Sequence, residues 1–206
     1  MTDTEGFILV GGASSRMGTD KSRLDFGGQT AVACIALALQ SLTARISVVG
    51  AEPGNKHGSL LNVPDLRPRW GALGGIHTAL NACEADWAAI VACDLPFVTA
   101  ELFARLRAFA SNATLEPVAA VVPIQPDGRP QPLCALYRRR PCLKQAQRLI
   151  AEGEHAPRAL LSVVPTRWVE SSELSDLPGA ENFFFNANTP EEYEQAKRIL
   201  ASKQGA

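Results

Sequence analysis

Apolar runs alternate with segments of helical periodicity along most of the chain. Strands are predicted at the apolar runs 7–10, 46–49, 87–92, 118–122 and 183–185. Several of these runs are apolar at every position, which indicates strands that are buried on both faces, as in a parallel sheet. The alternation of such strands with helices over short connections predicts an open, doubly wound α/β sheet.

Four segments have the pattern of helices. Apolar side chains recur at intervals of three or four residues in 32–42 and 102–109, and a further helix is predicted at about 142–150. The fourth is predicted from Pro190 to about Leu200, because Thr189 can cap it, Pro190 takes its first position and Glu192 its third. Helices on both faces of a mostly parallel sheet would give a Rossmann-like three-layer sandwich.

The segment Pro126–Pro130 carries turn residues and leads into the apolar run Leu133–Tyr137. This pattern predicts a hairpin or crossing element, which we expect to cover a second substrate. The chain shows neither an internal repeat nor a boundary between domains. We therefore expect a single domain over residues 1–206.

Composition narrows the class of protein. Hydrophobic residues make up 46% and charged residues 20% of the 206 residues, close to the globular average. The net charge of −1 argues against the broad basic surface of nucleic-acid-binding proteins. The longest apolar run, Ala31–Leu39, is too short to cross a membrane. These features predict a protein that binds neither nucleic acid nor membrane.

The N-terminus and the cysteines indicate a cytoplasmic protein. Residues 1–6 are polar and acidic, unlike the basic start of a secretory signal. The five cysteines contain no C-x-x-C pair, so neither a disulfide framework nor a zinc ribbon is predicted. Most of them have apolar neighbours, as expected of small core residues in a reducing compartment.

A glycine-rich segment, Gly11–Lys21, follows the first predicted strand. Paired glycines at a strand end let backbone N–H groups approach a phosphate or a base, and Arg16 and Lys21 add positive charge. The segment contains no G-x-G, and Asp20 rather than glycine precedes Lys21, so it is neither a dinucleotide fingerprint nor a P-loop. It is a third kind of nucleotide loop or, alternatively, a glycine turn with surface cations.

Five segments, in order, resemble motifs of the molybdenum cofactor guanylyltransferase family, also called molybdopterin-guanine dinucleotide biosynthesis protein A. They are Leu9–Lys21, Gly71–Ile76 (G-P-L-x-G-[IM] in the family), Cys93–Pro96 (C-D-x-P), Gln131–Tyr137 (x-P-L-x-A-L-Y) and Asn186–Pro190 (N-x-N-T-P). The resemblance spans about residues 7–200. It implies a Mg²⁺-dependent nucleotidyltransferase that transfers GMP from GTP to the phosphate of molybdopterin and releases pyrophosphate. Cofactor-insertion or client proteins would be possible docking partners.

The resemblance also implies roles for individual residues. The catalytic residues would be Arg16, Lys21 and Asp94, with Asp94 as the metal ligand. The nucleotide would be bound by Leu9, Val10, Gly11, Gly12, Lys21, Asp65 and Asp94. The second substrate would be bound by Asn186 and Asn188.

The chemistry of these residues suits the implied roles. Asp94 follows the predicted strand 87–92, at the edge where open sheets bind ligands, and Mg²⁺ is commonly held by one or two carboxylates with phosphates and waters. The alternative for Asp94 is a turn or helix cap, although Thr99 is the better cap. Asp65 can accept from the guanine N–H donors or from a ribose hydroxyl, or is an exposed loop acid. Asn186 and Asn188 follow the predicted strand 183–185 and offer amides to metal or phosphate, or serve the turn.

The chain departs from the family pattern in places. Ala72 stands where the family has proline, the spacing from Gly18 to Lys21 is one residue shorter than in some relatives, and Gly50 stands where many members have asparagine. A nucleotide contact at Gly50 would therefore be made by the main chain. The alternatives are a cytidylyltransferase on the same cofactor, another small-molecule or sugar-phosphate nucleotidyltransferase, or a noncatalytic nucleotide sensor. The basic run Arg138–Arg140 attracts a substrate phosphate or is solvated surface.

Overall fold

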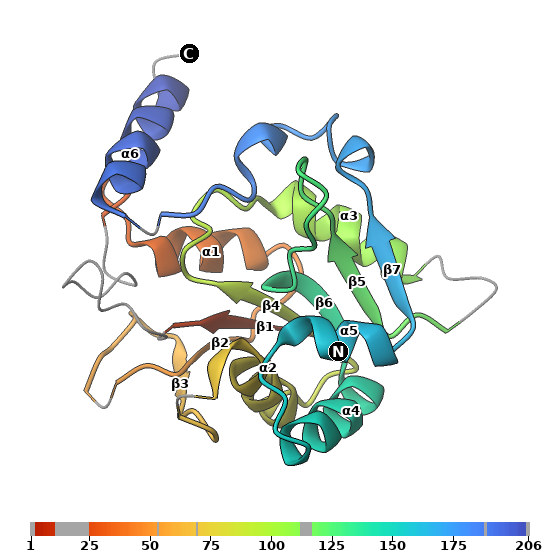
Figure 1. Ribbon diagram of the computed structural model, residues 1–206. Coiled ribbons are helices and arrows are strands. Elements are labelled where there is room, and N and C mark those ends of the chain that lie inside the picture. The colour runs from red at the N-terminus through yellow and green to blue at the C-terminus, as the bar shows by residue number, and fades with distance from the viewer. Residues whose placement is uncertain are drawn as a thin grey trace.

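The computed structural model describes residues 3–10, 25–52, 54–68, 70–111, 117–187 and 189–204. Residues 201–204 are described by their backbone alone. Its strands form one sheet in the order β3-β2-β1-β4-β6-β5-β7 (Figure 1). The strands are β1 (Thr4–Leu9), β2 (Ile46–Val49), β3 (Leu61–Val63), β4 (Trp87–Ala92), β5 (Ala120–Pro123), β6 (Cys134–Arg138) and β7 (Thr166–Val169).

The strands β3, β2, β1 and β4 are parallel and end at one level. Leu9 is in register with Val49 of β2 and with Ala92 of β4, and Val49 is in register with Val63 of β3. The residues that directly follow these four strands therefore meet at one edge of the sheet. β6 runs antiparallel to β4 and β5, and β7 is parallel to β5. The predicted mostly parallel sheet is confirmed.

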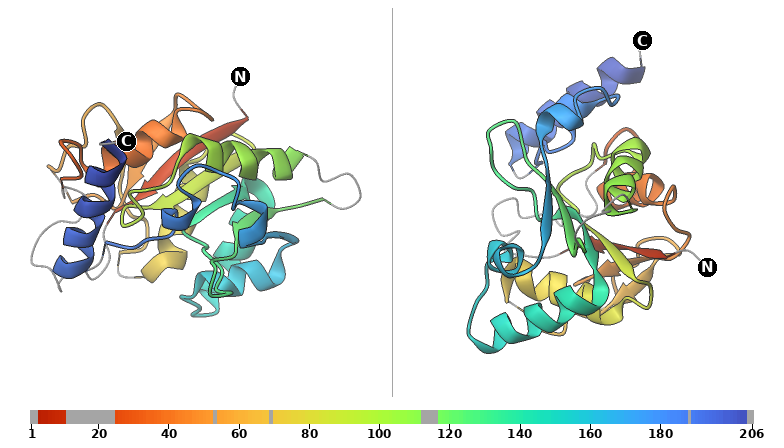
Figure 2. Two further views of the ribbon diagram at one scale, coloured as in Figure 1. Left: turned by 90° about the horizontal axis from the view of Figure 1, so that it is seen from above. Right: turned by 90° about the vertical axis from the view of Figure 1, so that its right-hand side faces the viewer.

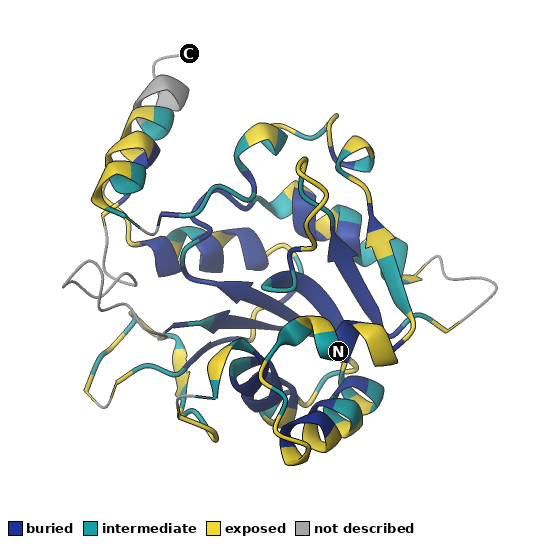
Figure 3. Cartoon of the chain, in the orientation of Figure 1, coloured by how far each residue is buried: buried dark blue, intermediate teal, exposed yellow. Residues whose placement is uncertain are grey.

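Helices cover both faces of this sheet (Figures 1 and 2). Their bounds are α1 (Ala31–Leu39), α2 (Gly71–Ala82), α3 (Ala100–Ser111), α4 (Arg139–Ala151), α5 (Pro157–Val163) and α6 (Pro190–Gln204), with 3₁₀ turns η3 (Ser171–Glu173) and η4 (Ala180–Asn182). One apolar core joins α1 and α3 to the sheet, and a second joins α2, α4 and α5 to its other face. The inner strands β1, β2, β4, β5 and β6 are almost wholly buried, whereas the edge strands β3 and β7 are mostly not (Figure 3). The Rossmann-like three-layer sandwich is thus confirmed.

The helix α6 stands at one side of the sandwich, away from both main cores (Figures 1 and 2). Its start follows the prediction: Thr189 N donates to Glu192 Oε2 at 2.9 Å, and Glu192 N donates to Thr189 Oγ1 at 3.2 Å. This reciprocal capping satisfies two backbone N–H groups that would otherwise lack a partner at the helix start. Of the described residues of α6, only Ala196 is fully buried, so the helix makes a small contact with the rest of the fold.

Some predicted elements are wrong and others were missed. The apolar run 183–185 is not a strand: Phe183 ends η4, and Phe185 N donates to Asn182 O at 3.0 Å in a turn. Its apolar character has another cause, because Phe183 lies in the core beneath α1 and α3 whereas Phe185 packs near α6. β3, β7, α2 and α5 were not predicted. The expected hairpin is present, since β5 and β6 are antiparallel neighbours.

In the part of the chain that the structure describes, none of the helices combines the length and the apolar character of a membrane span.

Candidate functional site

The candidate site is built at the edge where the four parallel strands end. Backbone hydrogen bonds continue one residue beyond the strands: Val10 N donates to Val49 O at 2.9 Å, and Cys93 N donates to Leu9 O at 3.0 Å. These bonds fix the chain that enters the glycine-rich segment beside the chain that leads to Asp94. The Asp94 side chain is partly exposed at this edge. The Val10 side chain is buried, so any contact with a nucleotide there falls to its main chain.

Asn186 is brought to Asp94 from the far end of the sequence. Ala187 N donates to the Asp94 carbonyl at 3.1 Å, which ties the two motif segments together directly. Asn186, one residue earlier, is partly exposed. A carboxylate and an amide therefore lie on adjoining segments at the carboxyl edge of β4.

Asp65 is held by α2. Its Oδ1 accepts from the Thr78 hydroxyl at 3.0 Å and from Arg67 N at 2.9 Å, and Thr78 Oγ1 accepts from Leu66 N at 3.1 Å. Thr78 is fully buried, so these bonds fix the loop after β3 against the helix. The second carboxylate oxygen of Asp65 forms no hydrogen bond with a described residue. It is therefore free to accept from a ligand.

The glycines at the start of α2 serve close packing. A Cβ built on Gly75 would lie 3.1 Å from Leu9 Cδ1, and one on Gly74 would lie 2.8 Å from Trp70 Cβ. Gly75 therefore lets the helix lie close to Leu9 at the end of β1, and Gly74 leaves room for Trp70 at the helix start. The motif that resembles the family's G-P-L-x-G segment thus brings α2 onto the strand that leads into the glycine-rich segment.

The loop between α4 and α5 clamps the start of α2. The rings of Trp70 and His155 stack with their centroids 4.3 Å apart, and Trp70 Nε1 donates to Glu154 O at 3.0 Å. His155 O also accepts from Leu73 N at 3.4 Å, which satisfies one of the open N–H groups at the helix start. Trp70, Thr78 and His155 were not predicted as site residues, although a tryptophan directly before the motif was an available signal.

The family's asparagine position is occupied by Gly50, with φ at +83°. Its N–H donates to Val63 O at 3.1 Å and is therefore committed to the sheet. The expected main-chain contact with a nucleotide at this position is left to the carbonyl. A Cβ here would lie 2.5 Å from Val10 O, so only glycine fits without a shift of the backbone.

Several predicted site residues lie outside the described part of the chain. They are Gly11, Gly12, Arg16, Lys21 and Asn188. Their implied roles stay predictions. The basic run Arg138–Arg140 is described and lies elsewhere, because Arg138 is in register with Trp87 at the start of β4, the opposite edge from Asp94. The structure thus favours its alternative interpretation as surface charge.

The donor set around Asp94 fits Mg²⁺. The described residues contain no group of three or more His, Cys, Asp or Glu side chains that could cage a metal ion. Mg²⁺ in phosphoryl-transfer sites is bound through one or two carboxylates, and substrate phosphates and waters complete its shell. Asp94, with the Asn186 amide on the adjoining segment, offers oxygen ligands of that kind.

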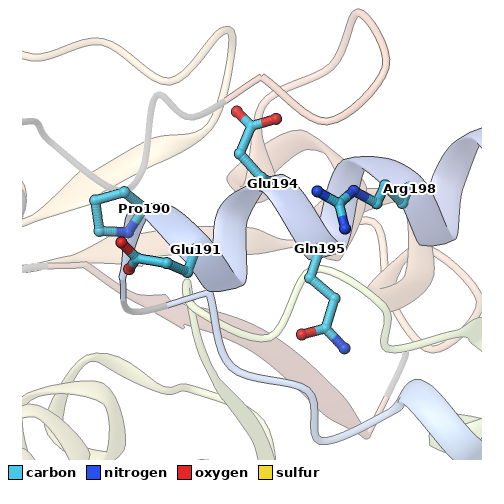
Figure 4. A pocket seen from close by; sticks show the side chains of 5 residues that line it. All are labelled: Pro190, Glu191, Glu194, Gln195 and Arg198. Atoms are coloured by element: carbon cyan, nitrogen blue, oxygen red, sulfur yellow. The ribbon is translucent and has the colours of Figure 1, made fainter.

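A pocket of about 550 Å³ lies along the first turns of α6. Its described lining residues are Pro190, Glu191, Glu194, Gln195 and Arg198, whose side chains project from this one helix (Figure 4). Two carboxylates and one guanidinium give this surface mixed charge. Pro190 is the only one of these residues that belongs to a motif segment, and Asp94 is not among them.

Comparisons with known proteins agree with this geometry. Residues 6–170 match the family described as "MobA-like NTP transferase domain". Relatives from Bacillus cereus and Bacillus anthracis, each described as a probable molybdenum cofactor guanylyltransferase, are 32% identical over 209 aligned positions, which cover 98% of this chain and 100% of theirs.

Solved structures share the fold. Molybdopterin-guanine dinucleotide biosynthesis protein A from Archaeoglobus fulgidus superposes with a TM-score of 0.80 at 24% identity, covering 96% of this chain and 99% of its own. The 2-C-methyl-D-erythritol 4-phosphate cytidylyltransferase from Thermus thermophilus gives 0.67 at 17% identity, covering 95% and 98%. The sequence matches extend over most of the chain, and the chain therefore belongs to the MobA-like NTP transferase family.

Proposed function

We propose that this protein transfers GMP from GTP to the terminal phosphate of molybdopterin and releases pyrophosphate. The observation that carries the proposal is the meeting of Asp94, Asn186 and the end of β1 at one edge of the sheet, joined by the Cys93–Leu9 and Ala187–Asp94 backbone bonds. Full-length relatives that are described as molybdenum cofactor guanylyltransferases support the choice of substrates.

The proposed reaction is a displacement at the α-phosphorus of GTP. A phosphate oxygen of molybdopterin forms a new P–O bond there, while the bond from the α-phosphorus to the oxygen that bridges to the β-phosphorus breaks. The electron pair of that bond leaves with pyrophosphate. A phosphate monoester is mostly dianionic at neutral pH, because its second pKa is about 6, so the attacking oxygen requires no general base. Positioning and charge neutralisation then do most of the catalytic work.

In this proposal the residues of the chain supply both the positioning and the charge neutralisation. Asp94 would hold Mg²⁺, and the chemistry that a bound Mg²⁺ supplies is neutralisation of charge on the phosphate oxygens. Arg16 and Lys21 would stabilise the negative charge on the triphosphate. Leu9, Val10, Gly11 and Gly12 would contact the nucleotide, and Asn186 and Asn188 would orient the second substrate.

Acceptors beside β2 and β3 support guanine as the base. Guanine presents N1–H and N2–H₂ donors, which require acceptors. The second carboxylate oxygen of Asp65 and the carbonyl of Gly50 lie on the loops that directly follow β3 and β2, which are neighbours in the sheet. The bonds from Thr78 and Arg67 to Asp65 Oδ1 hold that carboxylate in place before a ligand binds.

The alternatives are distinguished by one set of assays. The affinities of the protein for GTP, CTP, UTP and ATP are measured with Mg²⁺, followed by pyrophosphate release with and without molybdopterin. We expect GTP to bind most tightly and pyrophosphate release to require molybdopterin. Tightest binding of CTP would instead indicate a cytidylyltransferase. Nucleotide binding without any pyrophosphate release would indicate a sensor.

The Lys21→Ala variant tests the glycine-rich segment. We expect it to remain folded and to lose turnover by orders of magnitude, since a fixed positive charge at the phosphates is worth roughly 10²–10³ in rate. A matched control is Lys144→Ala, which removes an exposed lysine on α4, outside the candidate site. Near-normal turnover in Lys21→Ala would contradict the role given to that segment.

A further inference from the structure

Four aromatic side chains connect three segments of the candidate site with α6. Phe26 lies five residues after Lys21, Phe97 three residues after Asp94, and Phe185 directly before Asn186, while Tyr193 lies on α6. The ring centroids of Phe26 and Tyr193 are 5.4 Å apart, those of Phe26 and Phe97 6.5 Å, and those of Phe97 and Phe185 5.9 Å. All three pairs meet edge to face. We call these four side chains the aromatic cluster.

The cluster anchors a turn that is otherwise exposed. Residues 25–30 close on themselves, because Phe26 N donates to Gln29 O at 2.7 Å and Gly28 N donates to Asp25 Oδ1 at 2.6 Å. Every residue of this turn is exposed except Phe26, whose side chain is 3% exposed. Phe26 is thus the one buried residue of the turn, whose last residue, Thr30, caps α1.

A hydrogen bond from α6 reinforces the anchor. The Tyr193 hydroxyl donates to the Asp25 carbonyl at 2.7 Å. Since its ring also packs on Phe26, Tyr193 holds both the backbone and the side chain at the start of the turn. Ala196, one turn later on α6, is fully buried in the same apolar group. The contact surface of α6 therefore coincides with the anchor of the turn.

The anchored turn follows the glycine-rich segment in the sequence, with Asp25 four residues after Lys21. Four peptide units separate Lys21 from Asp25, and a chain of that length spans at most roughly 14 Å. Whatever fixes Asp25 therefore limits the positions open to Lys21. At its other end the glycine-rich segment leaves Val10, which is bonded to β2.

We propose that the aromatic cluster holds the turn 25–30, the Asp94 loop and the Asn186 segment in one arrangement. Tyr193 and Phe26 are then positioning residues for nucleotide binding. The inference rests on the proposed function, because it takes these segments to belong to the nucleotide site. It gives α6, which lies beyond the residues 6–170 that match the family, a task in nucleotide binding. Phe97 then fixes the Asp94 loop and Phe185 the Asn186 segment to the same anchor.

The test compares nucleotide affinity with stability in four variants of the full-length protein. Tyr193→Ala and Phe26→Ala remove ring contacts, and Tyr193→Phe removes only the hydroxyl. Phe109→Ala is the matched control, since it removes a partly buried ring on α3 that contacts Arg167 and is not part of the aromatic cluster. For each protein, the Kd of GTP with Mg²⁺ and the thermal midpoint without nucleotide are measured at one protein concentration.

We expect the Kd to rise roughly tenfold or more in Tyr193→Ala and Phe26→Ala. In Tyr193→Phe the rise is roughly fivefold, the loss expected for one hydrogen bond. Phe109→Ala keeps the wild-type Kd even where its thermal midpoint falls as far. If Tyr193→Ala does not fold, Tyr193→Phe and the control carry the test.

Wild-type Kd values in the Tyr193 and Phe26 variants would overturn the inference and leave the proposed function intact. A rise in Phe109→Ala as large as in Tyr193→Ala would overturn it as well, because the effect would then follow stability alone. A wild-type protein that binds none of the four nucleotides would instead contradict the proposed function itself.

Discussion

Substitution of Gly50 by alanine is expected to disturb the point where β1 leads into the glycine-rich segment. Gly50 has φ at +83°, and a Cβ there would lie 2.5 Å from the Val10 carbonyl oxygen. Real Cβ atoms do not approach an oxygen so closely, so either β2 or the end of β1 has to move. The added methyl group thus acts on Val10 through the backbone.

The size of the effect follows from two contributions. Left-handed backbone costs about 1–2 kcal/mol for a residue with a Cβ. The shift of backbone strains two hydrogen bonds, Val10 N to Val49 O at 2.9 Å and Gly50 N to Val63 O at 3.1 Å, each worth about 1 kcal/mol. We therefore expect Gly50→Ala to lower the free energy of unfolding by about 2–4 kcal/mol.

Gly54→Ala separates the two contributions. Gly54 also has a positive φ, +90°, but a Cβ there would meet no atom within 4 Å. Its expected loss is the conformational part alone, about 1–2 kcal/mol. Urea unfolding of both variants measures the difference, and titration with GTP and Mg²⁺ measures the effect on binding, which we expect only for Gly50→Ala. Equal losses of stability in the two variants would refute the assigned clash with Val10.

Three further predictions concern other parts of the fold. Thr78→Val removes the hydroxyl that donates to Asp65 and accepts from Leu66 N. It should lower the free energy of unfolding by about 1–2 kcal/mol and weaken GTP binding. An unchanged urea midpoint together with an unchanged Kd of GTP would contradict the role of Thr78. Burial raises the pKa of the Cys83, Cys134 and Cys142 thiols to about 12. A thiol reagent at pH 8 should therefore label the partly exposed Cys34 far faster than these three in the native protein. Fast labelling of any of the three would contradict their burial. The hydrogen bond from Arg105 lowers the pKa of Asp176, so the stabilising effect of this ion pair is present above the unfolded-state pKa and is lost as the pH falls. The loss of thermal midpoint caused by Asp176→Asn should therefore be smaller at about pH 3 than at about pH 6. An equal loss at both pH values would argue against the ion pair.

The sequence predicted the strands that are buried on both faces. β4 is a continuous apolar run, and β1 and β2 are apolar apart from Thr4, Glu5, Gly6 and Ser47, a pattern that burial between two helical layers produces directly. The start of α6 was predicted because its capping residues act locally, within one helical turn. By contrast, β3 has three residues, none of them buried, and gives no periodic signal. Pairing with β2 alone makes it a strand.

The run 183–185 shows that consecutive apolar residues need not form a strand when they are buried in two different cores. Phe183 and Phe185 are covered by separate cores on either side of a turn, so their apolar side chains do not indicate an extended strand. For α2, the opposite problem arises. Its glycines lower helix propensity, yet Gly75 lets the helix pack on Leu9 of β1, and this tertiary contact outweighs the local preference.

The candidate site could be predicted where residues belong to motifs that follow strands. Asp94 was predicted in this way. Asn186 was predicted from its motif, although the run before it is a turn and not a strand, and the Ala187–Asp94 bond brings the two segments together. Thr78 could not be predicted, because its role depends on a contact with Asp65 across thirteen positions of sequence. The pairing of Phe26 with Tyr193 could not be predicted for the same reason, because the two rings are far apart in sequence and meet only in the folded protein.

The most direct test of the account is pyrophosphate release from GTP and molybdopterin in the presence of Mg²⁺ by the wild-type protein and by Asp94→Asn. Asp176→Asn serves as the control carboxylate, since it pairs with Arg105 on α3. We predict release by the wild-type and control proteins, and a loss of roughly 10²-fold or more in Asp94→Asn with its fold intact. Wild-type rates in Asp94→Asn would contradict the central claim that this carboxylate organises the site.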